Sequence, residues 1–404
     1  MNDTALEGVK VIEYCRTLTG AYTGKILADF GAEVLKIEQP GVGDEARRKA
    51  PFPADIPHPE KSGLFLYLNT NKLSLTLDPD KATGKEIFRR LVKDTDVLLE
   101  DGAPGEIERL GLGYEELKEI NPGLIMTSIT PFGRSGPYKD YKAYQLNLAN
   151  ASGQAYLLPL PSPNLERPPV KPGGNLVEYD SALMAVIAIL AAVFWKGISG
   201  EGQFIEMSKQ EALLNLQRVE AVTYANAGVI MDRTGRSGQV MPGGVMPCLD
   251  GYVVVVTPEQ HQWDALMELI GNPEWSKKPW CANRSARSDN AVELTALITE
   301  WMRKHTKEEI YRKGQALSCP ISPLHTTEDM VKSEQLQARG FFVEMDHPVA
   351  GKMKSPGSAY RFSESPWQLR RPAPLLGQHN EEIYCDRLSY GRDELVMMRE
   401  AGII

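Results

Sequence analysis

The sequence lacks the features of several protein classes. Its 404 residues hold 45 Lys and Arg against 53 Asp and Glu, and without a basic excess we expect no nucleic-acid partner. The five cysteines are scattered, with no C-x-x-C pair, and this suits free thiols in a reducing cytoplasm better than a disulfide framework or a zinc site. The longest apolar run, 182–195, has 14 residues. It is short for a membrane span of ~20 residues and is typical of a buried core helix, so no membrane partner is expected.

Common catalytic signatures are also missing. No P-loop, G-x-S-x-G or G-x-G-x-x-G segment occurs, so the NTPase, serine hydrolase and nicotinamide-enzyme classes have little support. The six histidines show no metal-ligand spacing, and the N-terminus has neither the basic nor the apolar region of a secretory signal. We therefore expect a cytoplasmic protein without a metal.

What the chain does contain is the composition of a globular protein, 42% apolar and 24% charged, at a length that favours two domains. The first 130 residues alternate strand and helix signals, which predicts an α/β fold with a parallel sheet covered on both faces. Expected strands cover 9–15, 33–38, 73–77, 97–100 and 124–129, and expected helices cover 20–30 and 82–94. The alternation in 73–77 predicts a half-buried strand.

Two segments interrupt this order. The Pro-rich stretch 159–174 is predicted to be a loop, and the Gly-rich stretch 235–244 marks a domain boundary. Between them we expect helices over 178–195 and 208–227. A strand over 252–256 and amphipathic helices follow the boundary, and strand-and-loop structure with a final helix ends the chain.

The most informative motif surrounds Glu178, in Gly174-Asn-Leu-Val-Glu178-Tyr-Asp180-Ser-Ala-Leu-Met. Ser199-Gly-Glu-Gly-Gln-Phe-Ile-Glu-Met-Ser208 follows at a fixed distance. This frame resembles the nucleophile region of the class III CoA-transferases, the family of formyl-CoA transferase and carnitine CoA-transferase. There an Asp begins a helix and Thr-Gly-x-Gly-Gln-x-Ile-Asp follows. An ungapped alignment places the family's Asp on Glu178.

Other motifs extend the resemblance over nearly the whole chain, in the family's order. They are Leu6-Glu-Gly-Val-Lys-Val-Ile-Glu13, Leu27-Ala-Asp-Phe-Gly-Ala-Glu-Val-Leu-Lys-Ile-Glu38, Pro40-Gly-Val-Gly-Asp44, Asn69-Thr-Asn-Lys72, Arg109-Leu-Gly-Leu-Gly113, Phe132-Gly-x-x-Gly136-Pro137, His347-Pro-Val-Ala-Gly351 and Arg371-Pro-Ala-Pro-x-Leu-Gly377-Gln-His379. One such segment is weak evidence, whereas their shared order identifies the chain as a member of the family.

The resemblance implies a fold and an assembly. The family has a Rossmann-like large domain built from both chain ends and a smaller α+β middle domain. The boundaries above then assign residues 1–228 and 330–404 to the large domain and 229–329 to the small one. Two subunits of the family thread through one another as interlocked rings, so a homologous subunit is the expected partner, in a homodimer or a heterodimer.

The resemblance also implies an activity. CoA passes from an acyl-CoA donor to a carboxylic acid acceptor through a mixed anhydride and an enzyme–CoA thioester formed on a carboxylate, without a metal. Glu178 is the catalytic candidate. Lys72, Arg109 and Lys142 match family positions that contact CoA, whose phosphates require cations. Each could equally be an ordinary surface charge, and Glu178 could be an acid that stabilises its helix dipole.

Several departures keep alternatives open. Glu is one methylene longer than Asp, and neighbouring positions also differ from the family, at Leu18, Ala21, Asp101-Gly102, Gln145 and Ala182. The site could be reshaped around Glu178. Alternatively, this chain could be a silent, CoA-binding subunit paired with an Asp-bearing homologue, since members such as benzylsuccinate CoA-transferase have two homologous subunits.

Three further interpretations are weaker. A racemase-like relative would need a His–Asp pair, and no His lies near Tyr144. Asp180 as nucleophile requires a two-residue shift, which turns the helix by ~200° and presents another face. The stretch 235–244 resembles the family's mobile loop that shields the anhydride from water, or it is an interdomain hinge.

Overall fold

The computed structural model describes residues 4–159, 164–216, 218–231, 233 and 241–404. They form two compact units, one of Met1–Ala155, Lys171–Arg218 and Ala338–Ile404, the other of Tyr156–Val170 and Val219–Gln337. The predicted large domain also included 156–170, 219–228 and 330–337, which the structure places in the second unit. Within that unit the Arg233 guanidinium donates to the carbonyl oxygens of Leu165 and Arg167, which connects the described part of the Pro-rich stretch to it.

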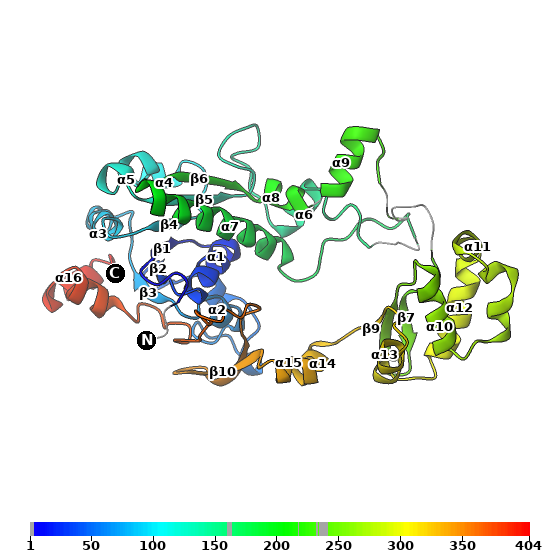
Figure 1. Cartoon of the computed structure of the whole chain (residues 1–404). Coiled ribbons are helices and arrows are strands. Elements are labelled where there is room, and N and C mark those ends of the chain that lie inside the picture. Colours follow the sequence, from blue (N-terminus) through cyan, green and yellow to red (C-terminus); the bar gives the residue numbers. More distant parts are fainter. Residues whose placement is uncertain (1–3, 160–163, 217, 232, 234–240) are drawn as a thin grey trace. The chain divides into compact units, whose positions relative to one another are not determined.

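The first unit contains a six-stranded parallel sheet in the order β3-β2-β1-β4-β5-β6 (Figure 1). Its strands are β1 Lys10–Tyr14, β2 Glu33–Glu38, β3 Leu73–Thr76, β4 Val97–Glu100, β5 Ile125–Thr130 and β6 Phe204–Ser208. The chain runs outward from β1 to β3, then returns to β4 on the other side of β1. This reversal is the topological switch point of a Rossmann-like fold, where the carboxyl ends of the strands form a crevice for ligands.

Helices cover both faces of the sheet, as predicted. On one face lie α1 (Leu18–Asp29) and α7 (Leu176–Ser199), which share a core with the inner strands through Leu27, Leu99 and Ile189. The opposite face is covered by α3 (Ala82–Val92), α5 (Tyr114–Ile120) and α16 (Arg392–Glu400). The remaining elements of this unit up to β6 are η1 Glu45–Arg48, η2 Pro53–Asp55, α2 Gly63–Leu68, α4 Glu106–Arg109 and α6 Gln145–Ala151.

The Gly-x-Gly-Gln segment is a tight connection between α7 and β6. Gly200 ends α7 in the left-handed region, at φ 77°, as glycine does at many helix ends. A Cβ on Gly202 would lie 2.0 Å from the Leu124 carbonyl oxygen, so only glycine allows β6 to approach β5 at this point. The motif therefore fixes the path from the helix that carries Glu178 to the edge of the sheet.

Strand β3 departs from the prediction because it is fully buried rather than half-buried. A C-terminal segment covers its polar side chains: Asn380 donates to the Thr76 hydroxyl at 2.7 Å, and the Tyr384 hydroxyl donates to the Thr76 carbonyl oxygen at 2.7 Å. The alternation of polar and apolar residues remains, but the polar face meets protein instead of water. The sequence pattern could not show this, because the covering segment lies some 300 residues away.

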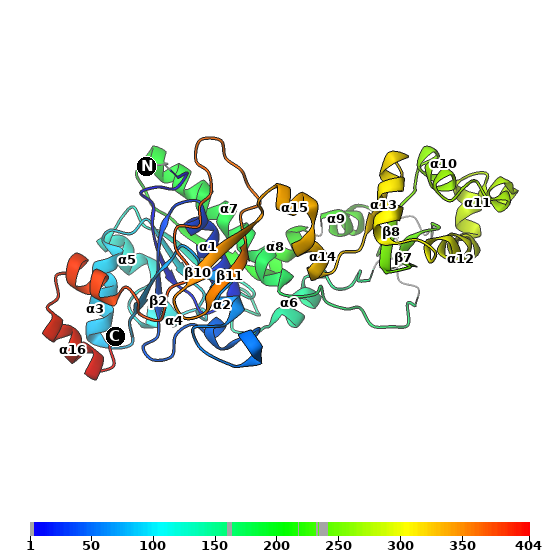
Figure 2. The ribbon, with the colours of Figure 1, turned by 90° about the horizontal axis from the view of Figure 1, so that it is seen from below.

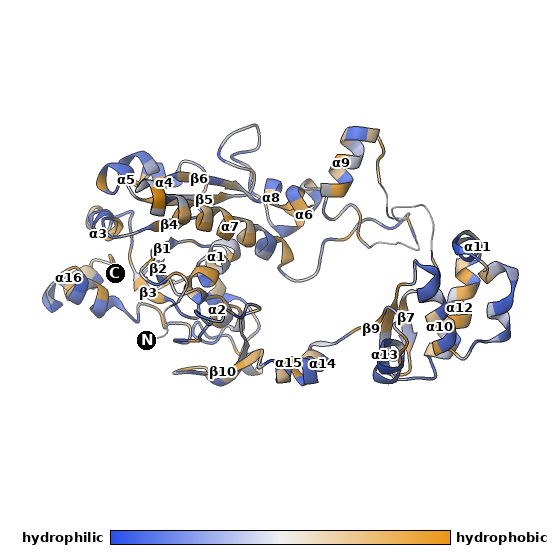
Figure 3. Ribbon diagram, viewed as in Figure 1, coloured by the Kyte–Doolittle hydropathy of each residue, from blue (hydrophilic) through white to orange (hydrophobic). Residues whose placement is uncertain are grey.

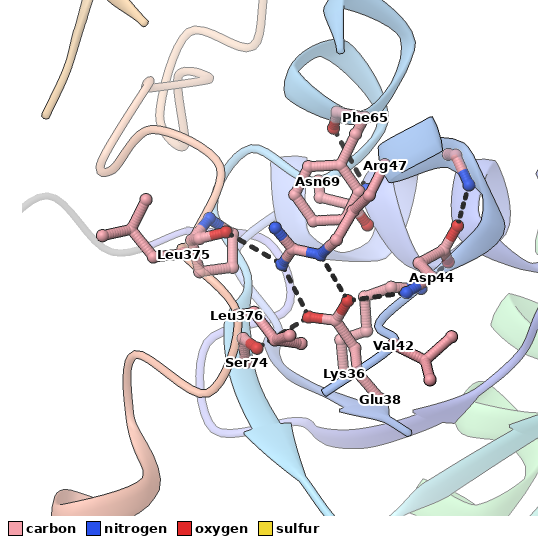
Figure 4. Close-up of polar contacts among 12 residues, drawn as sticks. Lys36, Glu38, Val42, Asp44, Arg47, Phe65, Asn69, Ser74, Leu375 and Leu376 are labelled. Carbon is pink, nitrogen blue, oxygen red and sulfur yellow. Dashed lines mark hydrogen bonds and ion pairs between the residues drawn. The ribbon is translucent and has the colours of Figure 1, made fainter. Parts of the chain in front are cut away.

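A buried arginine also joins the two ends of the chain (Figure 4). Arg47, with no exposed surface, binds Glu38 through two hydrogen bonds of 2.7 and 2.8 Å and donates to the Pro374 carbonyl oxygen at 3.1 Å. The Ser74 hydroxyl donates to the same carboxylate at 2.7 Å, and the guanidinium lies 3.7 Å from the centre of the Phe65 ring. The large unit is thus built from both ends of the sequence.

The C-terminal part of this unit begins with a hairpin of β10 (Phe342–His347) and β11 (Gly351–Pro356), seen near α1 and α2 in Figure 2. Met345 packs in one cluster with Leu18 of α1 and Phe65 of α2. The π-helical turn η5 (Glu382–Arg387) and α16 follow. Strand and loop with a final helix is the predicted order for this region.

The second unit has an antiparallel sheet of β7 (Gly244–Cys248), β8 (Gly251–Val255) and β9 (Ile321–Pro323). Helices pack against it around Trp263, Ile298 and Ile310, which gives the expected small α+β architecture. Its other elements are α9 Arg218–Ala227, α10 Gln260–Leu269, η3 Glu274–Lys277, η4 Pro279–Cys281, α11 Arg284–Asp289, α12 Ala291–Met302, α13 Lys307–Ala316, α14 Thr327–Lys332 and α15 Glu334–Ala338. The predicted boundary at 235–244 lies mostly outside the described residues.

One helix prediction needs correction and another does not. The expected helix over 208–227 corresponds to α8 (Lys209–Leu216) and α9 (Arg218–Ala227), with residue 217 outside the described residues, and the division between the two units falls after Arg218. Helix α7 is only partly a buried core helix: Leu183, Ile187, Phe194 and Ile198 form an exposed apolar stripe on it, and hydrophobic residues make up much of its length in Figure 3. By length and composition alone α7 could span a membrane, with 33% of its most apolar window buried.

Candidate active site at the carboxyl end of the sheet

Glu178 lies in the first turn of α7, where its carboxylate meets two other elements. The Lys209 ammonium lies 2.8 Å from Glu178 Oε2, and the Thr19 hydroxyl donates to the same oxygen. Thr19 is in the first turn of α1, and Lys209 is the first residue of α8, immediately after β6. Three helix beginnings therefore converge on one carboxylate at the carboxyl side of the parallel sheet.

The surroundings keep this carboxylate ionised. Burial by itself would raise the pKa of Glu178, but the Lys209 charge and the Thr19 hydrogen bond outweigh it, and the pKa lies below the ordinary glutamate value. The amino end of α7 adds a favourable partial charge. Both described contacts fall on Oε2, so among the described residues Oε1 receives no hydrogen bond. One oxygen is anchored and the other is available for attack on an electrophile.

Asp101 fixes the turn that carries Thr19. Its carboxylate accepts hydrogen bonds from the backbone N–H groups of Arg16 and Thr17, at 2.7 and 2.8 Å, and from the Thr17 hydroxyl at 2.6 Å. These bonds hold the link between β1 and α1. Burial raises the pKa of Asp101, and its three hydrogen bonds counteract part of that rise. Asp101 is one of the positions at which the sequence departs from the family, and it acts here through the backbone.

Asp180, the alternative nucleophile, lies elsewhere on the helix. The Gln154 side chain donates to its carboxylate at 3.2 Å, and burial raises its pKa. It contacts neither Lys209 nor Thr19 among the described residues. The structure thus brings Glu178, and not Asp180, to the convergence of the three helices.

A cavity of about 370 Å³ opens in the crevice beside the switch point. It is lined by residues that follow β1, β2 and β3, including Arg16, Gly43, Arg48 and Asp78. Arg16 pairs with Glu106 at 2.9 Å, with more than half of its side chain exposed, and the Arg48 guanidinium donates to the Val42 carbonyl at 3.0 Å. The two partly exposed guanidinium groups can bind phosphate oxygens, although acidic side chains, among them Glu45 and Asp80, line the same cavity.

The three predicted CoA contacts do not share one environment. Lys72 is fully buried, and its ammonium binds Glu13 at 2.7 Å, the Ala21 carbonyl at 2.7 Å and Asn69 at 2.9 Å. Burial lowers its pKa to about 8. Arg109 ends α4 and Lys142 precedes α6; both are exposed, with no side-chain hydrogen bond or ion pair to any described residue. Arg109 and Lys142 are available to a ligand, whereas the described contacts of Lys72 are those of a structural charge.

Sequence reasoning missed Thr19, Lys209 and the positioning role of Asp101. Lys209 directly follows Ser208, the last residue of the motif, so the sequence could have predicted that Lys209 lies near the site, but not the orientation of its side chain. Thr19 is 159 residues from Glu178, and no local pattern connects them. Gln145, another departure, donates at 2.8 Å to Asn175, the residue before α7, and so supports the same helix start.

A family model described as CoA-transferase family III matches residues 6–380. The chain belongs to CoA-transferase family III. A formyl-CoA:oxalate CoA-transferase of Streptomyces coelicolor is 33% identical, with 100% of both chains covered. One from Afipia carboxidovorans is 31% identical, over 99% of this chain and 97% of the relative.

Solved structures agree with this membership. A CAIB/BAIF family protein from Brucella suis has a TM-score of 0.85 at 30% identity and covers 95% of this chain and 99% of its own. The protein Rv3272 of Mycobacterium tuberculosis has a TM-score of 0.79 at 26% identity, over 94% and 99% of the two chains. The chain is therefore a class III CoA-transferase in fold and family, and its substrate chemistry involves CoA.

Proposed function

We propose that this class III CoA-transferase moves CoA between an acyl-CoA donor and a carboxylic acid acceptor, with Glu178 as the nucleophile. The observation that supports this is the asymmetric setting of its carboxylate, with Oε2 held by Lys209 and Thr19 and Oε1 without a hydrogen bond among the described residues. An ionised, anchored carboxylate with one available oxygen is what covalent catalysis by Glu requires.

The proposed reaction proceeds by carboxylate exchange. Oε1 of Glu178 attacks the donor thioester carbonyl, the C–S bond breaks, and CoA thiolate leaves a mixed anhydride on Glu178. The thiolate then attacks the Glu178 carbonyl carbon, which releases the donor acid as a carboxylate and leaves a Glu178–CoA thioester. The acceptor carboxylate repeats the two steps in reverse order, and CoA leaves as the new acyl thioester. Electrons and atoms balance without an oxidant or a metal.

In this proposal the CoA phosphates lie in the crevice beside the switch point. Arg16 and Arg48 line its cavity, and Arg109 and Lys142 present exposed cations without described partners. Lys72 remains a predicted contact from the family resemblance. Its complete burial favours a role in holding α1 against the sheet, because Gly24 of α1 lies directly over the pair of Lys72 and Glu13.

The named relatives suggest which substrates to try first. Both are formyl-CoA:oxalate CoA-transferases, so formyl-CoA is the first donor and oxalate the first acceptor. A racemase-like reaction has less support, since no histidine hydrogen-bonds to Glu178 among the described residues. His347 accepts instead from the backbone N–H groups of Val349 and Ala350.

A homologous subunit is the proposed protein partner. The exposed stripe on α7, with Ile187 62% and Phe194 73% accessible, presents large apolar side chains that a second chain would cover. Light scattering of the purified protein tests this. A monomer at micromolar concentration would contradict it, and a mixed oligomer with a homologous chain would indicate a heteromeric enzyme.

The test of the nucleophile is mass spectrometry of the purified chain after incubation with formyl-CoA and, separately, succinyl-CoA. We expect a CoA adduct, or a borohydride-reduced carboxyl, on the peptide that contains Glu178. Glu178→Gln should lose the adduct and Asp180→Asn should keep it. An adduct confined to a co-purified homologous subunit would contradict the proposal and make this chain the silent partner.

A further inference from the structure

The pair of Lys209 and Glu178 is nearly isolated from water. Their side chains are 6% and 9% exposed, and Glu178 is the ion-pair partner of Lys209 among the described residues. Asp101 is a second acid whose charge interacts with Lys209, but it forms no ion pair with that ammonium among the described residues; its carboxylate accepts from the backbone N–H groups of Arg16 and Thr17 and from the Thr17 hydroxyl, and burial raises its pKa. Glu178 is therefore the acid in direct contact with Lys209.

Covalent chemistry on Glu178 would remove that counter-charge. As an anhydride or a thioester, Glu178 is neutral, whereas the Lys209 ammonium stays where α8 begins. An unpaired buried charge is costly, so another anion must neutralise it or its proton must leave. In the reaction proposed above, an anion is available at each stage: first CoA thiolate, then the carboxylate of the released acid.

We propose that Lys209 is an alternating anion site, which binds Glu178 in the resting enzyme and the substrate carboxylate once Glu178 is acylated. The inference rests on the proposed function and adds to it a substrate-binding residue. When the Glu178–CoA thioester forms, the donor acid leaves as a carboxylate beside Lys209. The acceptor carboxylate takes the same place and attacks the Glu178 carbonyl carbon, and the negative charge ends on CoA thiolate.

The arrangement also explains an order of events. While Glu178 carries its charge, the Lys209 ammonium is paired with it, and the site has little free positive charge to bind the carboxylate of a free acid. After acylation the same ammonium attracts it. Carboxylates are thus admitted only when the enzyme can react with them, and the free acid competes weakly with acyl-CoA for the resting site. The Thr19 hydroxyl, which donates to the same Glu178 oxygen, can turn to the incoming group as well.

The test uses Glu178→Gln, which has nearly the shape of glutamate and, like the acylated residue, no charge. Titration calorimetry would compare oxalate and acetate binding to the wild type, to Glu178→Gln and to the double variant Glu178→Gln/Lys209→Met. We expect Glu178→Gln to bind either probe at least tenfold more tightly than the wild type, and Lys209→Met to abolish the gain. Glu178→Gln/Lys196→Met is the matched control, because Lys196 pairs with Asp96 elsewhere, and it should keep the gain.

Two results would overturn the inference: no gain in Glu178→Gln, or a gain that survives Lys209→Met. Thermal melts show that each variant is folded, and Glu178→Ala replaces Glu178→Gln if the latter is not. Failure here is separable from failure of the proposed function. If a covalent adduct forms on Glu178 but Glu178→Gln binds carboxylates no more tightly, only the alternating anion site is rejected. If the tighter binding depends on Lys209 but no adduct forms, Glu178 is not the nucleophile and Lys209 is an anion site alone.

Discussion

Two groups of buried charges in the large unit differ in how fully their hydrogen-bonding capacity is used. In the group around Arg47, Glu38 receives two bonds from that guanidinium and one from Ser74, and neither ionic side chain is exposed. At the helix beginnings, Glu178 receives both described contacts on one oxygen and retains 9% exposure of its side chain. The first group has no capacity left for a substrate, and the second has one oxygen left for it.

We propose that this difference in hydrogen bonding, more than the extent of burial, separates structural charges from the proposed nucleophile. Lys72, predicted as a CoA contact, belongs with the Arg47 group because three acceptors surround its ammonium. Glu178 is nearly as buried but incompletely bonded. A family motif identifies both positions without distinguishing their roles, since both are charged residues in similar sequence contexts.

The largest expected effect is on stability, from Arg47→Met. Loss of the guanidinium leaves Glu38 buried without its ion pair, and breaking such a pair from one side costs about 3–5 kcal/mol. Denaturant unfolding measures it. Arg392→Met is the control, since its partner is Glu381 and both side chains are mostly exposed, and we expect no measurable change there. If adduct formation at Glu178 is lost in a folded Arg47→Met protein, the division between structural and reactive charges is wrong.

Glu178→Asp tests whether the reactive site is built for the longer side chain. Withdrawal by one methylene moves the carboxylate away from both Lys209 and Thr19, and a displacement of ~1 Å lowers the rate by on the order of a hundredfold. Steady-state rates with the donor that forms the adduct measure this. Asp180→Glu makes the reverse change two positions away and should leave the rate almost unaltered. An Asp variant as fast as the wild type would show that Thr19 and Lys209 do not set the geometry.

Lys209→Met should change the pH dependence. The lowered pKa of Glu178 keeps its carboxylate ionised even at a pH where an ordinary glutamate becomes protonated, so wild-type kcat/KM falls only in more acidic solution. The stabilisation from this ion pair likewise exists above the unfolded pKa and is lost as pH falls through the folded one. Without Lys209, burial raises the pKa, and the acid limb should move up by about 1–3 units. An unmoved limb would contradict the role of Lys209.

Glu100 is a buried acid that belongs neither to the charges around Arg47 nor to those around Glu178, and Glu100→Gln tests its effect on stability. Burial raises the pKa of Glu100 to about 7. The folded protein holds a proton that the unfolded chain releases, so stability falls as pH rises from 4.5 to about 7. Glu100→Gln should remove this dependence. Relative to the wild type, the free energy of unfolding of the variant should then be about 1–3 kcal/mol higher at pH 8 than at pH 5. Urea unfolding at both pH values measures it, with the exposed Glu115→Gln as control.

The smallest effects are expected at the exposed cations. Arg109→Ala and Lys142→Ala should each raise KM for the acyl-CoA by about twofold to fivefold, the size of one solvent-exposed ionic contact, with kcat little changed. Lys139→Ala removes a neighbouring exposed charge and controls for general electrostatics. Equal effects in all three variants would mean that net charge, rather than specific contact, is responsible.

Much of the fold was predictable because its signals are local. The strands 33–38 and 97–100 occur at the predicted bounds, since their apolar runs end at clear turns. The burial of β3 was mispredicted, because it depends on which distant segment packs there. The described part of the Pro-rich stretch has no helix or strand, as predicted, yet 164–170 lie in a different unit from the one expected.

The family, the order of strands and helices, and the position of Glu178 could be predicted from the amino-acid sequence, because each rests on residues at fixed short spacing. The charges that surround that carboxylate depend on the tertiary fold. Lys209 and Thr19 reach it because α7 packs across α1 and the carboxyl end of β6 lies beside the start of α7. Contacts between side chains 31 and 159 residues apart depend on how helices pack on a sheet, and no local pattern encodes that geometry.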